Sequence, residues 1–206
     1  MINLNEYFEK VYCINLDRRP DRYKIVTEEF KKFDMKGVER YSAIDGNILE
    51  NNSPLLNGEL GILETHYNII KTCKENNVKN VLIIEDDVYF TNEITLIEDY
   101  LKLVPNDWDL LYFGGNHTYG TPPIKINDKV LKLNFSVALH CVAINQSIYD
   151  AILTLLPLKK KQVDSYYGQL QNGYNGYCFY PNIAKQKADF SDIQNKFVDY
   201  NNYFLN

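Results

Sequence analysis

Three acidic residues, Glu85, Asp86 and Asp87, directly follow the aliphatic run "VLII" at residues 81–84, which has the composition of a buried strand. Two carboxylates about 4 Å apart repel by about 4 kcal/mol at an effective dielectric near 20. A positive partner is therefore expected beside them. Because strand side chains alternate, Glu85 and Asp87 share one face if the strand continues through them.

Two carboxylates on one face suit a hard divalent ion, Mg²⁺ or Mn²⁺, which proteins usually share between a few carboxylates and substrate phosphates. Such an ion would also cancel the repulsion between the acids. The alternative is that the three acids lie at the start of a following helix, whose first turn favours negative charge. Taken alone, the acids leave both interpretations open.

Strand and helix patterns alternate around these acids. Strands are predicted at residues 10–16, 38–44, 80–87 and 109–115, with one or two more within 129–145. Helices are predicted after Pro20, from 57 to about 77, through 94–104, near 146–156 and through 164–173. This alternation is typical of an α/β fold with a mostly parallel sheet, in which ligands bind beyond the carboxyl ends of the strands. The tail from about residue 182 has weak periodicity, and no regular structure is predicted there.

The composition is that of one globular domain spanning residues 1–206, with 45% hydrophobic and 24% charged residues. The net charge of −5 argues against a nucleic acid partner, which requires clustered Lys and Arg. Four separated cysteines without a CxxC pair argue against a zinc site and a disulfide framework, and favour a reducing, cytoplasmic location. Neither a leader pattern nor an apolar run long enough to span a membrane is present, so no membrane span is expected.

Eight short motifs, in order over nearly the whole chain, resemble those of glycosyltransferase family 25. They are "INLDRRPDR" (14–22), "SAIDG" (42–46), "GELGILETH" (58–66), "LIIEDDV" (82–88), "DWDLLYFGG" (107–115), "HCVAIN" (140–145), "VDSYY" (163–167) and a final "YP…Q…SDI" that ends at Ile193. This family contains bacterial lipopolysaccharide-type galactosyltransferases and the sugar-transfer domains that modify collagen hydroxylysine. The chain departs from the family pattern in two ways: Thr65 stands where a serine commonly precedes the histidine, and the chain is shorter than many members. These departures leave the identity of the acceptor more open than the binding of the donor.

The resemblance implies a GT-A type nucleotide-binding α/β sandwich that binds a UDP-sugar through a divalent metal, Mn²⁺ or Mg²⁺. The implied reaction moves a hexose, galactose or glucose, with inversion, to a hydroxyl of a glycan or of a hydroxylysine-type protein. Such a site must hold the diphosphate charge, stabilise the leaving oxygen and remove the acceptor's proton. A metal ion serves the first two requirements, and a carboxylate serves the third as general base.

The candidate residues fall into three groups. The metal contacts are Glu85, Asp87 and His140; the nucleotide-sugar contacts are Asn15, Arg18, Arg19, Arg22, Asp45, Gly46, Glu59, His66 and Asp86; and the catalytic base is Asp164. The arginines follow the first strand, where guanidinium groups and helix amides could bind phosphate.

Each of these candidates has a structural alternative. The arginines could form surface ion pairs with neighbouring acids, and Asp45-Gly46 could be an ordinary turn. Glu59 and His66 lie seven residues apart, on one helix face, and could line the donor pocket or only form hydrogen bonds with their surroundings. His140 enters an apolar strand and could be a core histidine, while Asp164 could be a helix N-cap.

Two other functions use the same residues. A metal-dependent phosphohydrolase would release sugar or phosphate without an acceptor, and a catalytically silent member would bind only a nucleotide-sugar or a partner protein. The sequence leaves open which sugar is moved, what accepts it, and whether the chain works as a homodimer or within a larger enzyme.

Overall fold

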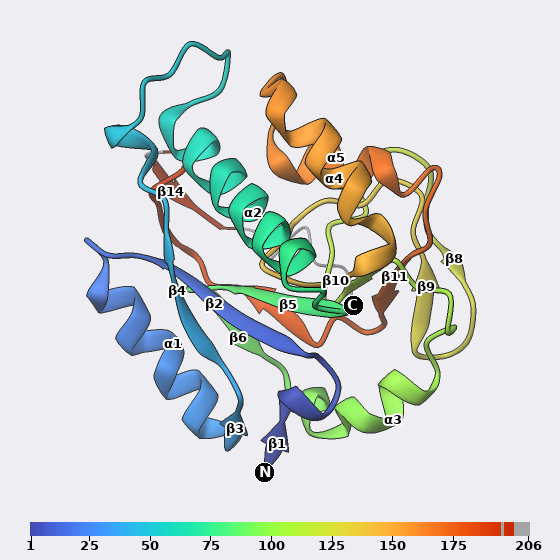
Figure 1. The fold of residues 1–206 in the computed structure, drawn as a ribbon. Helices are drawn as coiled ribbons and strands as arrows, with labels where there is room; N and C mark the ends of the chain where they lie inside the picture. The colour runs from blue at the N-terminus through green and yellow to red at the C-terminus, as the bar shows by residue number, and fades with distance from the viewer. Residues whose placement is uncertain (195, 200–206) are drawn as a thin grey trace.

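The computed structural model describes residues 1–194 and 196–199 and is built around an eight-stranded sheet (Figure 1). In spatial order the strands are β4 (Glu39–Ala43), β2 (Lys10–Leu16), β5 (Asn80–Glu85), β10 (Cys141–Asn145), β7 (Leu110–Tyr112), β11 (Gly176–Phe179), β9 (Val130–Lys132) and β8 (Ile124–Lys125). Strands β4, β2 and β5 are mutually parallel, and β11 is parallel to β7. Strand β10 runs antiparallel between β5 and β7, and β9 runs antiparallel to both β11 and β8.

Six of the eight strands, all except β9 and β10, therefore point the same way. The predicted α/β fold with a mostly parallel central sheet is confirmed. The antiparallel β10 lies directly beside β5, so the acids at the end of β5 are next to the start of β10.

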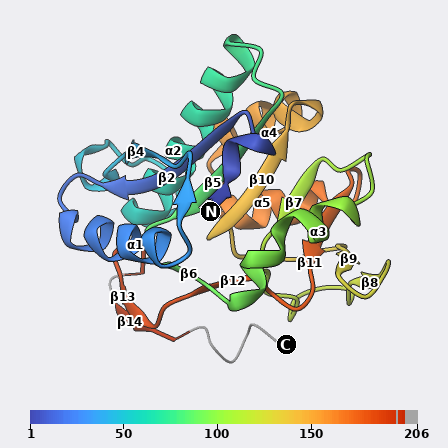
Figure 2. The ribbon, with the colours of Figure 1, turned by 90° about the horizontal axis from the view of Figure 1, so that it is seen from below.

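Helices cover both faces of the sheet (Figures 1 and 2). The long helix α2 (Asn57–Glu75) packs with α4 (Tyr149–Leu155) and α5 (Val163–Leu170) on one face. Helices α1 (Pro20–Lys32) and α3 (Ile97–Lys102) lie on the other face. Single 3₁₀ turns lead into or out of several of these elements: η1 (Leu4–Glu6), η2 (Gly46–Ile48), η3 (Asn92–Leu96), η4 (Gln146–Ile148) and η5 (Leu156–Leu158).

The apolar run before the acids is buried on both sides. Val81 and Ile83 of β5 pack on the side of α2, whereas Leu82 and Ile84 pack on the side of α1, and all four are fully buried. A strand covered on both faces reads as a continuous hydrophobic run. Burial of each such side chain contributes about 1.5–3 kcal/mol to the stability of the fold. The buried run therefore fixes where β5 ends and where the polar residues that follow it lie.

Three two-stranded pairings complete the structure. They are β1 (Ile2–Asn3) with β3 (Met35–Lys36), β6 (Val88–Phe90) with β12 (Ala184–Gln186), and β13 (Asp189–Ser191) with β14 (Lys196–Val198). Strands β12, β13 and β14 lie in the tail for which the sequence predicts no regular structure. Strands of three residues are too short to produce a recognisable alternation, and residues 195 and 200–206 lie outside the described part.

The strand that carries the acids is shorter than predicted. Strand β5 ends at Glu85, and Asp86 and Asp87 form a turn before β6. The prediction of one strand through residue 87 is therefore wrong, and so is the alternative of a helix directly after the acids. Over the described residues, no helix is both long enough and apolar enough to cross a membrane.

Candidate functional site

Polar residues gather where the parallel strands β2, β4 and β5 end. Asn15 lies near the end of β2, Asp45 follows β4, and Glu85 ends β5. The register pairs Ile14 with Glu85 and Asn15 with Ser42. The three strand ends therefore meet at one edge of the sheet, as expected for a ligand site in this kind of fold.

Arg22 is the positive partner of the acidic turn. It lies in the first turn of α1 with its side chain only 10% exposed, and its Nη2 atom is 2.6 Å from Asp86 Oδ1 and 3.0 Å from Asp87 Oδ2. Asp86 also accepts a hydrogen bond of 2.7 Å from Asn15 Nδ2. Burial raises the pKa of Asp86 to about 6, although Arg22 and Asn15 act in the opposite direction. The chain thus neutralises much of the repulsion itself.

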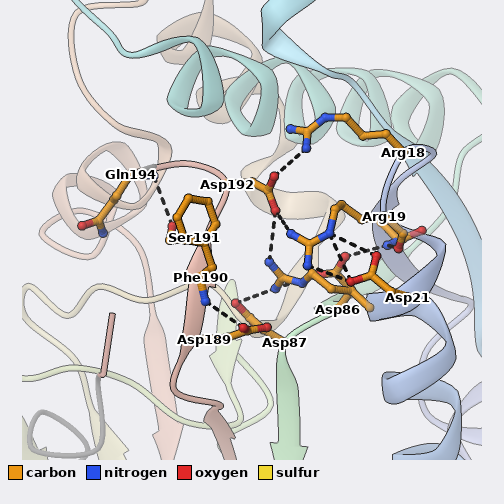
Figure 3. Close-up of polar contacts among 12 residues, drawn as sticks. Arg18, Arg19, Asp21, Asp86, Asp87, Asp189, Phe190, Ser191, Asp192 and Gln194 are labelled. Carbon is orange, nitrogen blue, oxygen red and sulfur yellow. Dashed lines mark hydrogen bonds and ion pairs between the residues drawn. The ribbon is translucent and has the colours of Figure 1, made fainter. Parts of the chain in front are cut away.

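Asp192 joins the arginines that follow β2 (Figure 3). Its Oδ1 accepts a hydrogen bond of 2.5 Å from Arg18 Nη1, and its Oδ2 pairs with Arg19 Nη1. Arg22 Nη1 lies 3.7 Å from the same Oδ2. Arg18 also donates from Nε to Asp45 Oδ2 at 2.6 Å. We call Arg18, Arg19 and Arg22 the arginine cluster; all three contact the carboxylate of Asp192.

Two cavities meet at the acids. The smaller, of about 90 Å³, is lined by Ile14, Asn15, Leu16, Arg18, Arg22, Ala43, Ile44, Asp45, Gly46, Gly58, Ile62, Thr65, Glu85, Asp86, Asp87, Ser191, Asp192 and Ile193. The larger, of about 430 Å³, extends toward Glu59, Gln162 and Asp164. Five residues line both cavities: Ile62, Glu85, Asp87, Ser191 and Ile193. The two cavities therefore adjoin, and these five residues form the wall between them.

Glu85 and Asp87 stand in this shared wall. Burial raises the pKa of Glu85 well above its usual range, and the charges of Asp87 and Asp86 raise it further. Asp87 Oδ1 is buried without a hydrogen-bond partner. A buried carboxylate oxygen that lacks a donor is costly, so this wall has the character of a site for a cation or a hydrogen-bond donor.

The carboxylates fit a divalent ion only in part. Within residues 1–194 and 196–199, no group of three or more His, Cys, Asp or Glu side chains is arranged to hold a metal. Glu85 and Asp87 supply hard oxygen donors, and Mg²⁺ is commonly bound by one or two carboxylates together with substrate phosphates. The geometry therefore fits an ion that arrives with a diphosphate and not a complete site formed by the protein.

The structure does not place His140 and His66 in either cavity lining. His140 is fully buried, and its Nε2 lies 3.0 Å from the Ala184 carbonyl oxygen, to which it donates, so this nitrogen is not available to a metal. The role of His140 as a metal contact stays a prediction, and this hydrogen bond restricts it to the other ring nitrogen. His66 is fully buried in the core, where Nδ1 lies 3.2 Å from the Tyr167 hydroxyl, and its predicted donor contact is not supported by its position.

The other predicted contacts are more mixed. Glu59 lines the larger cavity, where its carboxylate accepts hydrogen bonds from Leu56 N at 2.9 Å and from Gln162 Nε2 at 2.5 Å. Asp45 accepts from Asn47 N, so it does form a tight turn. Gly46 lines the smaller cavity and also packs against α2, because a Cβ there would lie 1.7 Å from Asn57 O.

Asp164 faces the larger cavity from the first turn of α5. Its Oδ1 is buried without a hydrogen-bond partner. Burial raises the pKa of Asp164, although the backbone amides of Ser165 and Ala138 lower it. The N-cap of α5 is Gln162. Asp164 is therefore not the N-cap, and it presents an unpaired carboxylate oxygen near the cavity.

Residues 8–187 match the family model described as "Glycosyltransferase family 25 (LPS biosynthesis protein)". The chain belongs to glycosyltransferase family 25.

Curated members of family 25 are moderately similar in sequence. The chain is 30% identical over 155 residues to the procollagen lysyl hydroxylase and glycosyltransferase of Acanthamoeba polyphaga mimivirus, covering 62% of this chain and 17% of that protein. It is 26% identical over 151 residues to human procollagen galactosyltransferase 2, covering 61% of this chain and 24% of that protein. The matches thus span about a fifth of the length of these relatives.

Solved structures resemble the chain only distantly. A glycosyltransferase involved in the glycosylation of the major capsid of PBCV-1 aligns with a TM-score of 0.41 at 12% identity, covering 74% of this chain and 67% of that one. The protein A197 from STIV aligns with a TM-score of 0.49 at 12% identity, covering 96% of this chain and 93% of that one.

Proposed function

We propose that this member of family 25 is a metal-dependent inverting glycosyltransferase. It would move a hexose, galactose or glucose, from a UDP-sugar to a hydroxyl of a glycan or of a hydroxylysine-type protein. The observation that carries the proposal is the pair of adjoining cavities, one lined by arginines and the other by Asp164, with Glu85 and Asp87 in the wall between them. A transferase needs a donor site and an acceptor site that meet where the sugar moves.

The arginine cluster supports a donor site for a diphosphate. Guanidinium groups bind phosphate oxygens with two parallel hydrogen bonds, and Arg18, Arg19 and Arg22 already hold a carboxylate in common. Arg22 is in the first turn of α1, whose free backbone amides favour an anion. The turn at Asp45 and Gly46 also lines the smaller cavity, and Asp45 accepts a hydrogen bond from Arg18, so the nucleoside would be held beside the arginine cluster.

Glu85 and Asp87 are the residues that would hold Mn²⁺ or Mg²⁺ with the donor. When bound, the ion would supply Lewis-acid stabilisation of the departing diphosphate. Ionised Glu85 is disfavoured by burial beside two acids, so a bound cation would also lower its pKa toward the usual range.

Asp164 is the proposed general base in the larger cavity. A base is most effective when its pKa is close to the working pH, and burial shifts the pKa of this carboxyl upward from its usual value. The carboxylate of Asp164 would accept the proton of the acceptor hydroxyl as the hydroxyl oxygen attacks the anomeric carbon and the bond from that carbon to the diphosphate, on the opposite side, breaks. At about 430 Å³ the cavity falls in the range of about 300–1,000 Å³ that is typical of ligand sites.

The test is a donor screen across UDP-sugars, each with and without Mn²⁺, that measures UDP release with and without a panel of sugar and hydroxylysine acceptors. Asp164→Asn is expected to reduce acceptor-dependent turnover by about 100-fold or more, the scale of general-base catalysis, while UDP binding is retained. Asp150→Asn is the matched control, because Asp150 is exposed and contacts only surface residues. Its activity is expected to equal that of the wild type.

Three outcomes would contradict the proposal. Sugar release that is equally fast without any acceptor would favour the phosphohydrolase. Binding of UDP with Mn²⁺ but no turnover with any acceptor would favour the silent member. Activity that is unchanged in Asp87→Ala would refute the assignment of the acidic wall.

A further inference from the structure

A short segment near the carboxyl end, which we call the strap, crosses the candidate donor site. The strap consists of residues 189–194 and includes β13. Before it, β12 pairs with β6 immediately after the acidic turn, and Lys187 N donates to Asp87 O at 2.9 Å. The strap is therefore held at its start beside the acids and runs from there to the arginine cluster (Figure 3).

Asp192 of the strap occupies the position that an anionic ligand of the arginine cluster would take. Its two oxygens contact Arg18 and Arg19 directly, and Arg22 is 3.7 Å away. Its side chain is only 14% exposed. A carboxylate and a phosphate make the same paired hydrogen bonds to guanidinium groups, so the two cannot be held by the same donors at once.

The backbone of the strap also fills space in the smaller cavity. A Cβ atom at Gly58, near the start of α2, would lie 2.5 Å from Ile193 Cα and 2.9 Å from Asp192 O. The close approach is possible only because residue 58 has no side chain. The remaining volume of about 90 Å³ is well below the roughly 300 Å³ at which ligand sites begin.

We propose that the strap is an internal occupant of the donor site, with Asp192 in the place of the donor's diphosphate, and that a diphosphate binds by displacing it. Only the identity of the ligand rests on the proposed function. Displacement frees the arginine cluster and opens the smaller cavity toward the larger one, because Ser191 and Ile193 of the strap line both.

Occupation by the strap has a measurable consequence. When only a fraction of molecules is open, the apparent Kd equals the intrinsic Kd divided by that fraction. A strap that is closed in about nine molecules of ten weakens binding about tenfold. Variants that loosen the strap should therefore bind a diphosphate more tightly, which is the opposite of the effect expected for residues that contact the ligand.

The experiment uses two variants that loosen the strap by different means. Asp192→Asn removes the charge that holds the arginines, and Gly58→Ala forces the strap backbone away while every charge stays in place. The controls are Asp128→Asn, which removes an exposed charge outside the strap and both cavities, and Gly173→Ala, where an added Cβ meets nothing within 4 Å. Affinities for UDP and for inorganic pyrophosphate are measured by titration calorimetry, and thermal melts verify that each variant is folded.

The proposal expects Asp192→Asn and Gly58→Ala each to tighten binding of both probes by ~3- to 10-fold, while the controls match the wild type. Weaker binding in both variants would overturn it, because Asp192 would then belong to the ligand site. Tighter binding in Asp192→Asn alone would also overturn it, because a charge effect would suffice. The absence of measurable pyrophosphate binding in every variant would also overturn the proposal.

The pyrophosphate measurements keep this test separate from the proposed reaction. If both loosening variants bind pyrophosphate more tightly but no variant consumes a UDP-sugar, the displacement of the strap is supported and the proposed function is refuted. If UDP-sugars are consumed but neither variant changes either affinity, the function stands and the strap fails.

Discussion

Replacing Arg22 with methionine would leave two partly buried acids without their cation. The Arg22 side chain is 10% exposed, and its partners Asp86 and Asp87 are 12% and 20% exposed. Removal of one member of a buried ion pair typically costs 3–5 kcal/mol, because the remaining charge is left uncompensated. Since these acids are not fully buried, we expect Arg22→Met to lower the free energy of unfolding by about 3 kcal/mol at pH 7.

The loss should depend on pH in a defined direction. Arg22 lowers the pKa of Asp86 against the effect of burial, so without Arg22 the pKa of Asp86 rises further and this carboxyl can relieve the cost by taking up a proton. Burial already raises the pKa of Asp86 to about 6 in the wild type. A carboxyl whose pKa is raised in the folded state favours folding at low pH and loses that contribution as pH rises through the folded pKa. The gap between the unfolding free energies of variant and wild type should therefore narrow as pH falls toward about 6, where Asp86 of the wild type itself takes up a proton.

The assay is urea denaturation followed by circular dichroism at several pH values. Lys102→Met is the control, because Lys102 is 62% exposed and its ion-pair partner Glu98 is 64% exposed. Exposed pairs contribute about 0–1 kcal/mol, so the control should lose far less stability than Arg22→Met. Equal losses in the two variants, or a gap that widens toward low pH, would refute the role given to Arg22.

Three further predictions concern packing, protonation and metal dependence. Gly46→Ala should destabilise the fold by about 3 kcal/mol in urea denaturation, since its Cβ would lie 1.7 Å from Asn57 O and overpacking commonly costs 1–3 kcal/mol or more; an effect no larger than that of Gly173→Ala would contradict this. Burial lowers the pKa of His66 to about 4, so the unfolded state binds the extra proton and stability should fall as pH drops from 6.5 to 4; melts of His66→Phe should show a shallower fall, and an unchanged slope would count against it. Chelation of divalent ions with EDTA should stop sugar transfer and added Mn²⁺ should restore it, whereas full activity in EDTA would exclude the proposed ion.

The parts of the fold that the sequence predicts are those with a strong periodic pattern. The series β2, α1, β4, α2 and β5 falls close to its predicted ranges, because each element has several apolar residues at a regular spacing. Strand β11, with the sequence "GYCF", was missed. It is four residues long and follows Asn-Gly pairs, which are typical of turns.

Sequence patterns also leave strand direction and order open. Strand β10 reads as an ordinary buried strand, and nothing in its periodicity indicates that it runs antiparallel between β5 and β7. Its placement follows from how the chain returns across the sheet. The alternation of strands and helices is sufficient to predict the α/β fold class. It does not predict that the antiparallel β10 lies between β5 and β7.

The sequence predicts which residues form the candidate site, but it does not predict which of them contact one another. The need for a positive charge beside Asp86 and Asp87 followed from electrostatics, but its source in Arg22 depends on the parallel pairing of β2 with β5. Asp192 lies in the last of the family-like motifs, but a motif does not indicate which residues its side chains contact, so the contact of Asp192 with the arginine cluster could not be foreseen. His140 and His66 could be ligands or core residues by sequence, and only burial and hydrogen bonding distinguish the two.

The most direct test of this account is a crystal structure of the protein with UDP and Mn²⁺. We predict that the diphosphate is bound by Arg18 and Arg19, that Asp192 has left these guanidinium groups, and that Mn²⁺ joins the diphosphate to Asp87. A diphosphate bound elsewhere, with Asp192 still paired to both arginines, would contradict the account.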